Sequence, residues 1–353
     1  MTKKKICVIF GGCSSEYGVS LQSAYSVIKN LKDDRYEKTL IGITQDGRWF
    51  LYEGDIERIP SDTWNDGRCR RAVLSPSRDK KGIIVFGNDS KEVSEFIPVD
   101  FVFPVLHGIN GEDGTVQGMI ELAGIPVVGC GMEASIICMD KNLAHILAER
   151  AGIKVPKSVT AHKKDAPKDY IDKAKAIGYP QFVKPVKAGS SFGISKVHCE
   201  EELIPAIEEA FRFDDHIIFE ENISGFEVGC AVFGKKNIKV SPVDEIELFV
   251  DWFDYEEKYT QFKSKIHMPA RISEDMSEEV RAAARHLYRA LGCDSFARVD
   301  IFINDENELV FNEINTIPGM TEHSRFPSMV RAMGIEYSDL LDILVDLAEG
   351  KEA

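Results

Sequence analysis

The stretch SFARVDIFINDENELVFNEINTIPGMTEHSRF, residues 295–326, decides how the rest of the chain is interpreted. Residues 295–303 and 308–314 are rich in the β-branched and aromatic residues typical of strands, and a short segment of Asn, Asp and Glu lies between them. Two strands joined by such a tight polar turn predict a β-hairpin. The hairpin would bring polar side chains from two strands onto one surface.

Strand side chains alternate between two faces, so Arg298 and Asp300 are expected to point the same way. On the partner strand, Glu313 and Asn315 are expected to point together. Two buried carboxylates placed side by side repel each other unless a cation lies between them. Mg²⁺ suits such oxygen ligands, because it completes its shell with water and nucleotide phosphates. A solvent-exposed hairpin with polar residues on its wet face is the alternative.

Length and charge limit the possible classes of protein. A chain of 353 residues suggests two or three domains with sizeable cores. The formal net charge of −15 provides no basic field, which argues against nucleic acid or an anionic membrane as a partner. No apolar run approaches the length of about 18 residues that a membrane span needs. The basic residues 3–5 precede a short strand-like run, so they do not indicate a signal peptide.

The eight cysteines are scattered, and none forms a Cys-x-x-Cys pair. Most of them have apolar neighbours in the sequence. This pattern predicts reduced thiols in the cores of a cytoplasmic protein.

The N-terminal region reads as the opening of an α/β unit. A strand at 5–10 is followed by two glycines and by a predicted helix at 20–31. Ligands bind beyond the carboxyl ends of such strands, so Glu16 is placed to hold a substrate ammonium group. A helix-capping role for Glu16 is the alternative. Residues 45–97 are predicted to form short strands with little chemistry.

A second buried strand, residues 99–106, runs into the glycine-rich loop HGINGEDGTVQG at 107–118. A helix is predicted from about residue 115 to 123. So many glycines before a helix indicate that the loop approaches a ligand closely, although turn chemistry alone can also account for them.

Lysines and small residues in the middle of the chain suit a nucleotide's phosphates. Lys141 stands in the first turn of a predicted helix, where a cation is unfavourable unless an anion is present. A strand at 181–185 carries Lys184, and the loop after it contains Ser190 and Ser191. Backbone donors of a small-residue loop bind phosphate well. This is not a Walker loop, because the G-K-[ST] order is absent.

Acidic residues follow a predicted strand at 216–220, and an aromatic, charged loop lies farther on. Glu220, Glu221 and Glu227, with Ile223 between them, could contact an adenine amino group and ribose hydroxyls. Exposed carboxylates at the surface are the alternative. Residues 249–265 are predicted to form a long loop of the kind that often closes over a reaction.

Taken together, these motifs resemble the D-alanine:D-alanine ligase family of ATP-grasp enzymes over about residues 4 to 345. The motifs are Phe10-Gly11-Gly12, Ser15-Glu16, the loop 107–118, Met139-Asp140-Lys141, Val183-Lys184-Pro185, Gly189-Ser190-Ser191, Arg298-Val299-Asp300, Asn312-Glu313-Ile314-Asn315-Thr316 and Pro318-Gly319. They occur in the family's order, which makes chance similarity improbable.

The resemblance implies an α/β (α+β) protein with the ATP-grasp fold. It implies a Rossmann-like parallel-sheet domain at 1–132, a central ATP-grasp domain at 133–228 and a C-terminal ATP-grasp domain at 229–353, with an active-site loop at 249–265. ATP would lie between two antiparallel sheets. The family also implies a homodimer that forms through the first domain.

The activity implied has two steps. ATP phosphorylates the carboxylate of a first D-alanine, and the amine of a second amino acid then attacks the acyl phosphate. The resemblance implies two Mg²⁺ ions, for which Mn²⁺ could substitute, held by Asp300, Glu313 and Asn315. It implies nucleotide contacts from Lys141, Lys184, Ser190, Ser191, Glu220, Glu221, Ile223, Glu227, Lys258 and Asn312. It implies catalytic roles for Glu16, Ser190, Tyr259, Arg298, Gly319 and Ser324.

The second substrate is expected to lie near Glu16, Asp244, Phe253, Arg298, Ser324 and Arg325. Arg325 stands where ligases that make D-alanyl-D-alanine usually carry leucine, and this region looks most like the VanG-type D-alanine:D-serine ligases of vancomycin resistance. Arginine can bind a serine hydroxyl, so D-serine is expected. Alternatively, Arg325 pairs with a carboxylate in a conventional D-alanine:D-alanine ligase. A nucleotide-binding homologue without catalysis and an ATP-grasp ligase for an unrelated acid and amine are more distant alternatives.

Overall fold

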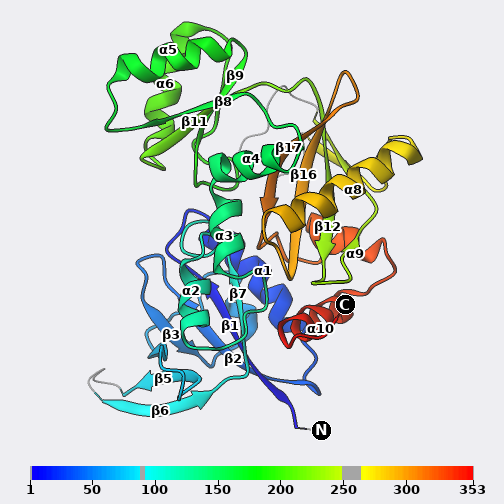
Figure 1. Cartoon of the computed structure of the whole chain (residues 1–353). Coiled ribbons are helices and arrows are strands. Elements are labelled where there is room, and N and C mark those ends of the chain that lie inside the picture. Colours follow the sequence, from blue (N-terminus) through cyan, green and yellow to red (C-terminus); the bar gives the residue numbers. More distant parts are fainter. Residues whose placement is uncertain (1, 88–91, 249–263, 353) are drawn as a thin grey trace.

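The computed structural model describes residues 2–87, 92–248 and 264–352. The described chain forms three sheets that follow one another through the molecule (Figure 1). The first sheet lies at one end, and the second and third sheets face each other across the other end (Figure 1). None of the helices in these ranges combines the length and hydropathy that a membrane span requires.

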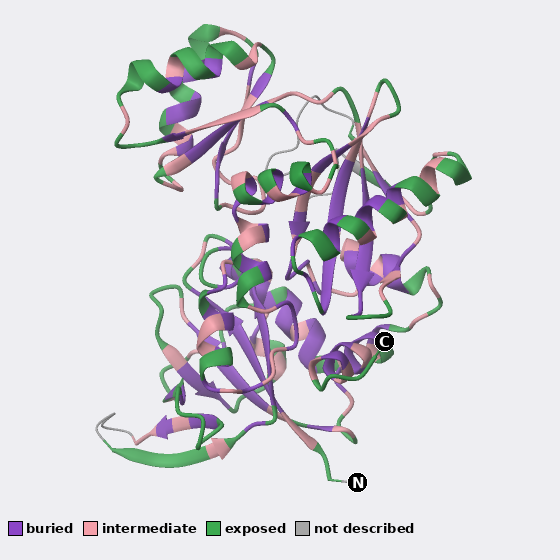
Figure 2. Ribbon diagram, viewed as in Figure 1, coloured by how far each residue is buried: buried purple, intermediate pink, exposed green. Residues whose placement is uncertain are grey.

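The first sheet is seven-stranded, with the order β6-β5-β4-β3-β2-β1-β7. Strand β1, next to the edge strand β7, pairs in parallel with β2 and β7 and is buried almost throughout, as its continuous apolar sequence predicts. The elements of this region are β1 (Lys4–Gly11), α1 (Tyr17–Asn30), β2 (Tyr36–Ile43), β3 (Trp49–Tyr52), η1 (Ile56–Arg58), β4 (Arg70–Leu74), β5 (Gly82–Phe86), β6 (Val93–Pro98), β7 (Phe101–Leu106) and α2 (Thr115–Leu122). The edge strand β6 is mostly exposed (Figure 2).

Two helices lead from the first sheet to the second, α3 (Met132–Met139) and α4 (Lys141–Arg150). Asp140 caps α4, and its carboxylate accepts a hydrogen bond from the Leu143 backbone N–H at 3.0 Å. The second sheet has the order β10-β9-β11-β8. Its elements are β8 (Ser158–His162), α5 (Pro167–Ile177), β9 (Gln181–Pro185), β10 (Ser195–Val197), α6 (Glu200–Ala210) and β11 (His216–Glu221).

The third sheet contains the hairpin. Its path is β15-β14-β12-β16-β17, with β13 paired to β12. Its elements are β12 (Gly225–Phe233), β13 (Lys239–Val240), β14 (Asp244–Leu248), β15 (Ser264–His267), α8 (Glu274–Ala290), β16 (Phe296–Asn304) and β17 (Leu309–Asn315). Strands β16 and β17 confirm the predicted hairpin within one residue at each end.

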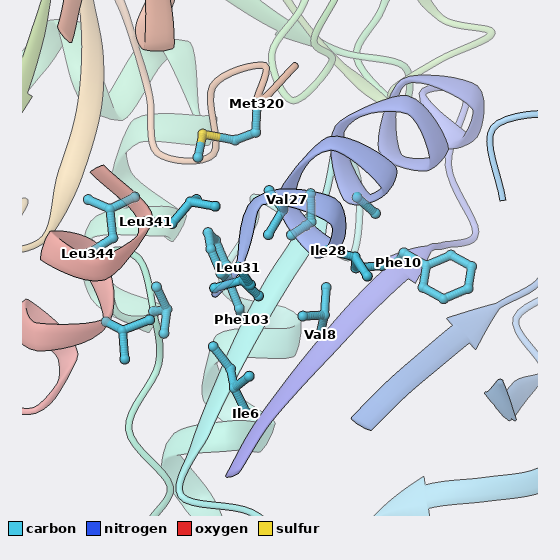
Figure 3. Packing of buried hydrophobic residues seen from close by; sticks show 14 of the residues in the cluster. Ile6, Val8, Phe10, Val27, Ile28, Leu31, Phe103, Met320, Leu341 and Leu344 are labelled. Carbon is cyan, nitrogen blue, oxygen red and sulfur yellow. The ribbon is translucent and has the colours of Figure 1, made fainter. Parts of the chain in front are cut away.

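The chain closes with α9 (Arg325–Arg331) and α10 (Tyr337–Ala348). The apolar side chains of α10 lie in a core that includes residues of the first sheet and of the neighbouring third sheet. Figure 3 shows Leu341 and Leu344 of α10 on one side of α1, with Val8 of β1 and Phe103 of β7 close by. The first core is therefore built from both ends of the chain.

Residues 45–97 do form the short strands that were predicted, but their packing is more substantial than the sequence suggested. The Trp64 side chain is almost wholly buried against Phe10, and their ring centroids are 5.1 Å apart. Its indole N–H donates to the Tyr17 hydroxyl at 3.0 Å, and that hydroxyl donates to Asp62 at 2.6 Å. Helix α1 begins at Tyr17, three residues earlier than predicted, because the Glu16 carbonyl already accepts the Val19 and Ser20 backbone N–H groups.

Candidate active site between the second and third sheets

A cavity of about 1390 Å³ lies between the second and third sheets and reaches the glycine-rich loops of the first. The structure brings most of the predicted site residues to its wall: Glu16, Lys141, Lys184, Ser190, Ser191, Glu220, Glu221, Ile223, Glu227, Arg298, Asp300, Asn312, Glu313, Asn315, Gly319, Ser324 and Arg325. Asp244 lies behind this wall, in contact with Arg325. Phe253, Lys258 and Tyr259, with the rest of the predicted loop, lie outside the described residues.

The hairpin places its four polar side chains as its alternation predicted. Arg298 pairs with Asn315, and Asp300 pairs with Glu313, across an antiparallel register that shifts after Asp300. The Asn315 amide donates to Asp300 Oδ2 at 3.1 Å and to Glu313 Oε1 at 3.2 Å. The Asp300 side chain is 1% exposed, so the alternative of a solvent-exposed polar hairpin is wrong.

Two guanidinium groups neutralise Asp300. Arg298 donates to both of its carboxylate oxygens, with Nη2 to Oδ2 at 2.6 Å. Arg325 Nη1 lies 3.3 Å from Oδ1. A buried carboxylate is thus paired twice, as burial of charge requires.

The residue types of this face fit a magnesium ion. Two carboxylates and one side-chain amide converge on it, and carboxylate and amide oxygens are the hard ligands that Mg²⁺ prefers. The Asn315 amide nitrogen faces the carboxylates in this structure, so its oxygen would ligate a cation only after the amide group rotates. In the part of the chain that the structure describes, no group of three or more His, Cys, Asp and Glu could hold a metal alone. A cation here would therefore need Asn315 and ligands from a nucleotide or water.

Two lysines face the opposite wall. Lys184 on β9 forms an ion pair with Glu220 on the neighbouring strand β11, and Lys141 Nζ donates to the Ala188 carbonyl at 2.7 Å. Burial alone would raise the pKa of Glu220, but the charges of Lys184, His145 and Lys141 and the hydrogen bond from Lys184 together outweigh it, and the pKa is lowered. Glu220 is therefore a buried anion, and the alternative of an exposed carboxylate is wrong for it.

The loop after β9 approaches the first sheet. Ser190 and Ser191 both have positive φ, 49° and 61°, a conformation that L-residues seldom adopt. The strained turn directs the Ser190 hydroxyl to the Glu16 carboxylate, to which it donates a hydrogen bond. Glu16 occupies the N-cap position of α1, but its side chain makes no capping hydrogen bond. Helix capping is therefore not what its carboxylate does.

Arg325 at the start of α9 lies among three carboxylates. It donates from Nε and Nη2 to Asp244 at 2.9 and 2.7 Å, and from Nη1 to Glu227 at 2.9 Å. Glu227 also accepts from the Asn312 amide at 3.2 Å. Arg325 thus pairs with a carboxylate, as the alternative for this position expected, and it still lines the cavity.

Sequence reasoning left several cavity residues without a role. His107 and Glu112 belong to the glycine-rich loop, and Glu112 accepts from the Gly108 backbone N–H at 2.9 Å. Burial and then the charge of Glu16 raise the pKa of Glu112 to about 8. The glycine spacing of 107–118 was the available signal for these residues. Arg271, which donates to Glu245 and to Glu247, carried no such signal.

Comparison with known proteins agrees with this geometry. The chain matches models described as the N-terminus and the C-terminus of D-ala D-ala ligase over residues 5–130 and 147–346. A D-alanine–D-alanine ligase of Caldicellulosiruptor bescii is 43% identical, covering 99% of this chain and 96% of that protein. The vancomycin/teicoplanin A-type resistance protein VanA of Enterococcus faecium is 41% identical, covering 99% of each chain. The crystal structure of VanG D-Ala:D-Ser ligase from Enterococcus faecalis has a TM-score of 0.89 and 50% identity, covering 98% of this chain and all of that one.

The fold and the cavity define an ATP-dependent ligase with the ATP-grasp fold. The chain belongs to the D-alanine–D-alanine ligase family, which includes vancomycin-resistance ligases.

Proposed function

We propose that this chain uses ATP to join D-alanine to D-serine through a D-alanyl phosphate, releasing ADP and phosphate. The observation that carries the proposal is Arg325, a guanidinium held at the cavity wall by Asp244. A serine hydroxyl can accept from such a fixed donor, whereas the methyl group of alanine cannot. The similarity to a VanG D-Ala:D-Ser ligase, at 50% identity, also supports it.

Asp300, Glu313 and Asn315 would hold two Mg²⁺ ions together with ATP. Bound Mg²⁺ would neutralise phosphate charge during phosphoryl transfer. Lys141 and Lys184, with the Ser190–Ser191 turn, would bind the phosphates. Glu220, Glu221, Ile223, Glu227 and Asn312 would bind the nucleoside, and Lys258 would add a further phosphate contact.

Glu16 would bind the ammonium group of the first D-alanine, because a carboxylate held by Ser190 at the cavity wall is a suitable partner for a cation. Arg298 and the Gly319 backbone N–H would stabilise the oxyanion that develops as the amine attacks. Phe253, Ser324 and Tyr259 would complete the acceptor end. The buried setting of the hairpin keeps these electrostatic interactions strong.

A conventional D-alanine:D-alanine ligase is the second candidate. The pairing of Arg325 with Asp244 favours it, because a neutralised arginine has less need of a serine hydroxyl. Relatives named D-alanine–D-alanine ligase, such as the protein of Caldicellulosiruptor bescii, favour it too.

The discriminating experiment supplies ATP, Mg²⁺ and D-alanine with an equimolar mixture of D-serine and D-alanine, and identifies the dipeptides by mass spectrometry. We expect mainly D-Ala-D-Ser, and a higher kcat/KM for D-serine than for D-alanine or D-lactate as the second substrate. Predominant D-Ala-D-Ala would establish the conventional ligase. No phosphate release with any of these acceptors would contradict ligation of D-alanine to them.

The same proposal extends to the setting of the reaction. A D-Ala-D-Ser product would enter peptidoglycan precursors in the cytoplasm and confer vancomycin resistance. We also propose a homodimer formed through the first domain, and the domain limits 1–132, 133–228 and 229–353. Exposed apolar side chains on α2 and α3, among them Leu122 and Met132, are consistent with such an interface.

A further inference from the structure

The segment 317–320 is fixed on both sides of Gly319. Before Gly319, the Ile317 backbone N–H donates to Glu112 Oε1 at 3.4 Å. After it, the Met320 backbone N–H donates to Ser23 Oγ at 3.3 Å, and the Met320 carbonyl accepts from the Tyr337 hydroxyl. Gly319 itself lines the cavity. Both peptide groups of Met320 are therefore anchored to buried side chains.

These anchors come from elements remote in the sequence. Ser23 lies on α1 and is wholly buried, and Tyr337 is the first residue of α10. Figure 3 shows Met320 above α1, on the same side of the first core as Leu341 of α10. The two helices thus hold the segment between them.

The Ser23 hydroxyl is itself oriented. His107 Nε2 lies 3.0 Å from Ser23 Oγ. Burial lowers the pKa of His107 to about 4, so its ring is neutral near pH 7. A neutral imidazole nitrogen can pair with a hydroxyl as donor or as acceptor, so His107 can hold the Ser23 hydroxyl while that hydroxyl accepts from the Met320 N–H.

Little space remains for Gly319 to move toward α9. A Cβ atom at this position would lie 2.9 Å from Ser324 Oγ, and Ser324 Oγ accepts from the Thr321 backbone N–H at 3.1 Å. A side chain at Gly319 would therefore meet Ser324, and the peptide group of Gly319 lies between residues whose own backbone groups are anchored.

We propose that Ser23 and Tyr337, with Glu112 and His107, are positioning residues that fix the Gly319 backbone N–H where it stabilises the oxyanion. The inference rests on the proposed ligase reaction, which gives this N–H its role. None of the four needs to touch the reacting atoms for this purpose. A preorganised donor acts only if it is already in place when charge develops, and a displacement of about 1 Å can cost on the order of 10²-fold in rate.

The test compares three hydroxyl deletions in the full chain. Ser23→Ala removes the acceptor of the Met320 N–H, and Tyr337→Phe removes the donor to its carbonyl. The matched control is Tyr36→Phe, because the buried Tyr36 hydroxyl also bonds to α10, at 2.7 Å to Asp342, but does not contact residues 317–320. For each variant, kcat, the KM for ATP and the unfolding midpoint in urea are measured.

We expect Ser23→Ala and Tyr337→Phe each to lower kcat by at least about tenfold, with the KM for ATP changed by less than about threefold. We expect the double variant to lose less than the product of the two single losses, because both hydroxyls fix the same residue, Met320. Tyr36→Phe should lose stability and keep its kcat. The urea midpoint identifies any variant that does not fold. If Ser23→Ala or Tyr337→Phe does not fold, the kcat of the other variant tests the positioning role.

Two failures are distinguishable. If the wild-type protein forms no dipeptide, the proposed function is overturned, and the positioning role with it. If the wild-type protein is active but Ser23→Ala and Tyr337→Phe keep the kcat of Tyr36→Phe, the positioning role alone is overturned.

Discussion

Replacement of Arg325 by leucine tests how much its ion pair with Asp244 stabilises the fold and whether Arg325 selects D-serine over D-alanine. The Arg325 side chain is 11% exposed and that of Asp244 is fully buried, so the substitution leaves an uncompensated carboxylate in the interior. Removing one partner of a buried ion pair generally costs about 3–5 kcal/mol. We therefore expect the free energy of unfolding of Arg325→Leu to fall by about this amount, measured by urea denaturation.

The double variant Arg325→Leu/Asp244→Leu should recover part of that loss, because the orphaned carboxylate is removed as well. Recovery will be incomplete, since Glu227 also loses its contact with Arg325. A double variant no more stable than Arg325→Leu would refute the assignment of the cost to Asp244.

The same substitution should change acceptor choice. Loss of a hydrogen bond to the serine hydroxyl costs about 1–3 kcal/mol of transition-state stabilisation, so kcat/KM for D-serine should fall by roughly 5- to 150-fold. The kcat/KM for D-alanine should be nearly unaffected. Arg271→Leu, which removes another cavity-lining guanidinium from a pair of carboxylates, is the control and should keep the D-serine to D-alanine ratio. A ratio unchanged within about twofold in Arg325→Leu would refute the role of Arg325 in selectivity.

Three further predictions follow from the same site. Arg298→Ala should lower kcat by at least about 10²-fold in a phosphate-release assay, and near wild-type turnover would remove Arg298 from the mechanism. Asp300→Asn should weaken binding of Mn²⁺ in the presence of ADP by at least about tenfold in a titration followed by electron paramagnetic resonance, and an unchanged affinity would contradict the metal site. Burial raises the pKa of Glu112 to about 8, so the folded protein retains a proton that the unfolded chain releases near pH 4.5. Between these two pKa values, Glu112 makes the free energy of unfolding fall as the pH rises, by up to about 1.4 kcal/mol per pH unit. Urea unfolding of Glu112→Gln between pH 5 and 8 should lack this part of the decline, and a slope equal to that of the wild type would contradict the buried, protonated state.

Local patterns in the sequence predicted the parts of the fold that depend on neighbouring residues. The alternation of 296–304 and the polar turn after it were enough to place Arg298 and Asp300 on one face, because strand geometry leaves no other arrangement. Lys184 could be placed on a strand for the same reason. The register shift after Asp300 had no signal in the sequence, since a bulge depends on how both strands fit the rest of the sheet.

Local patterns could not predict contacts between distant segments. The family resemblance placed Asp244 and Arg325 near one substrate, but no pattern near Arg325 indicates that it pairs with Asp244 and Glu227, because these two residues belong to strands that precede it by a long stretch of chain. The burial of Trp64 could not be predicted either. Trp64 lies within residues 45–97, for which the sequence predicted only short strands with little chemistry, and its side chain is buried in the first core. The positions of Phe253, Lys258 and Tyr259 remain predictions.

The sharing of the first core between the two ends of the chain has a consequence for synthesis on the ribosome. Leu341 and Leu344 cover part of one face of the first sheet, but they leave the ribosome only after the strands of the second and third sheets. Domains commonly fold as they emerge. Here the first sheet can be covered completely only once α10 has been made, so the nascent chain carries an open apolar surface while the second and third sheets are translated.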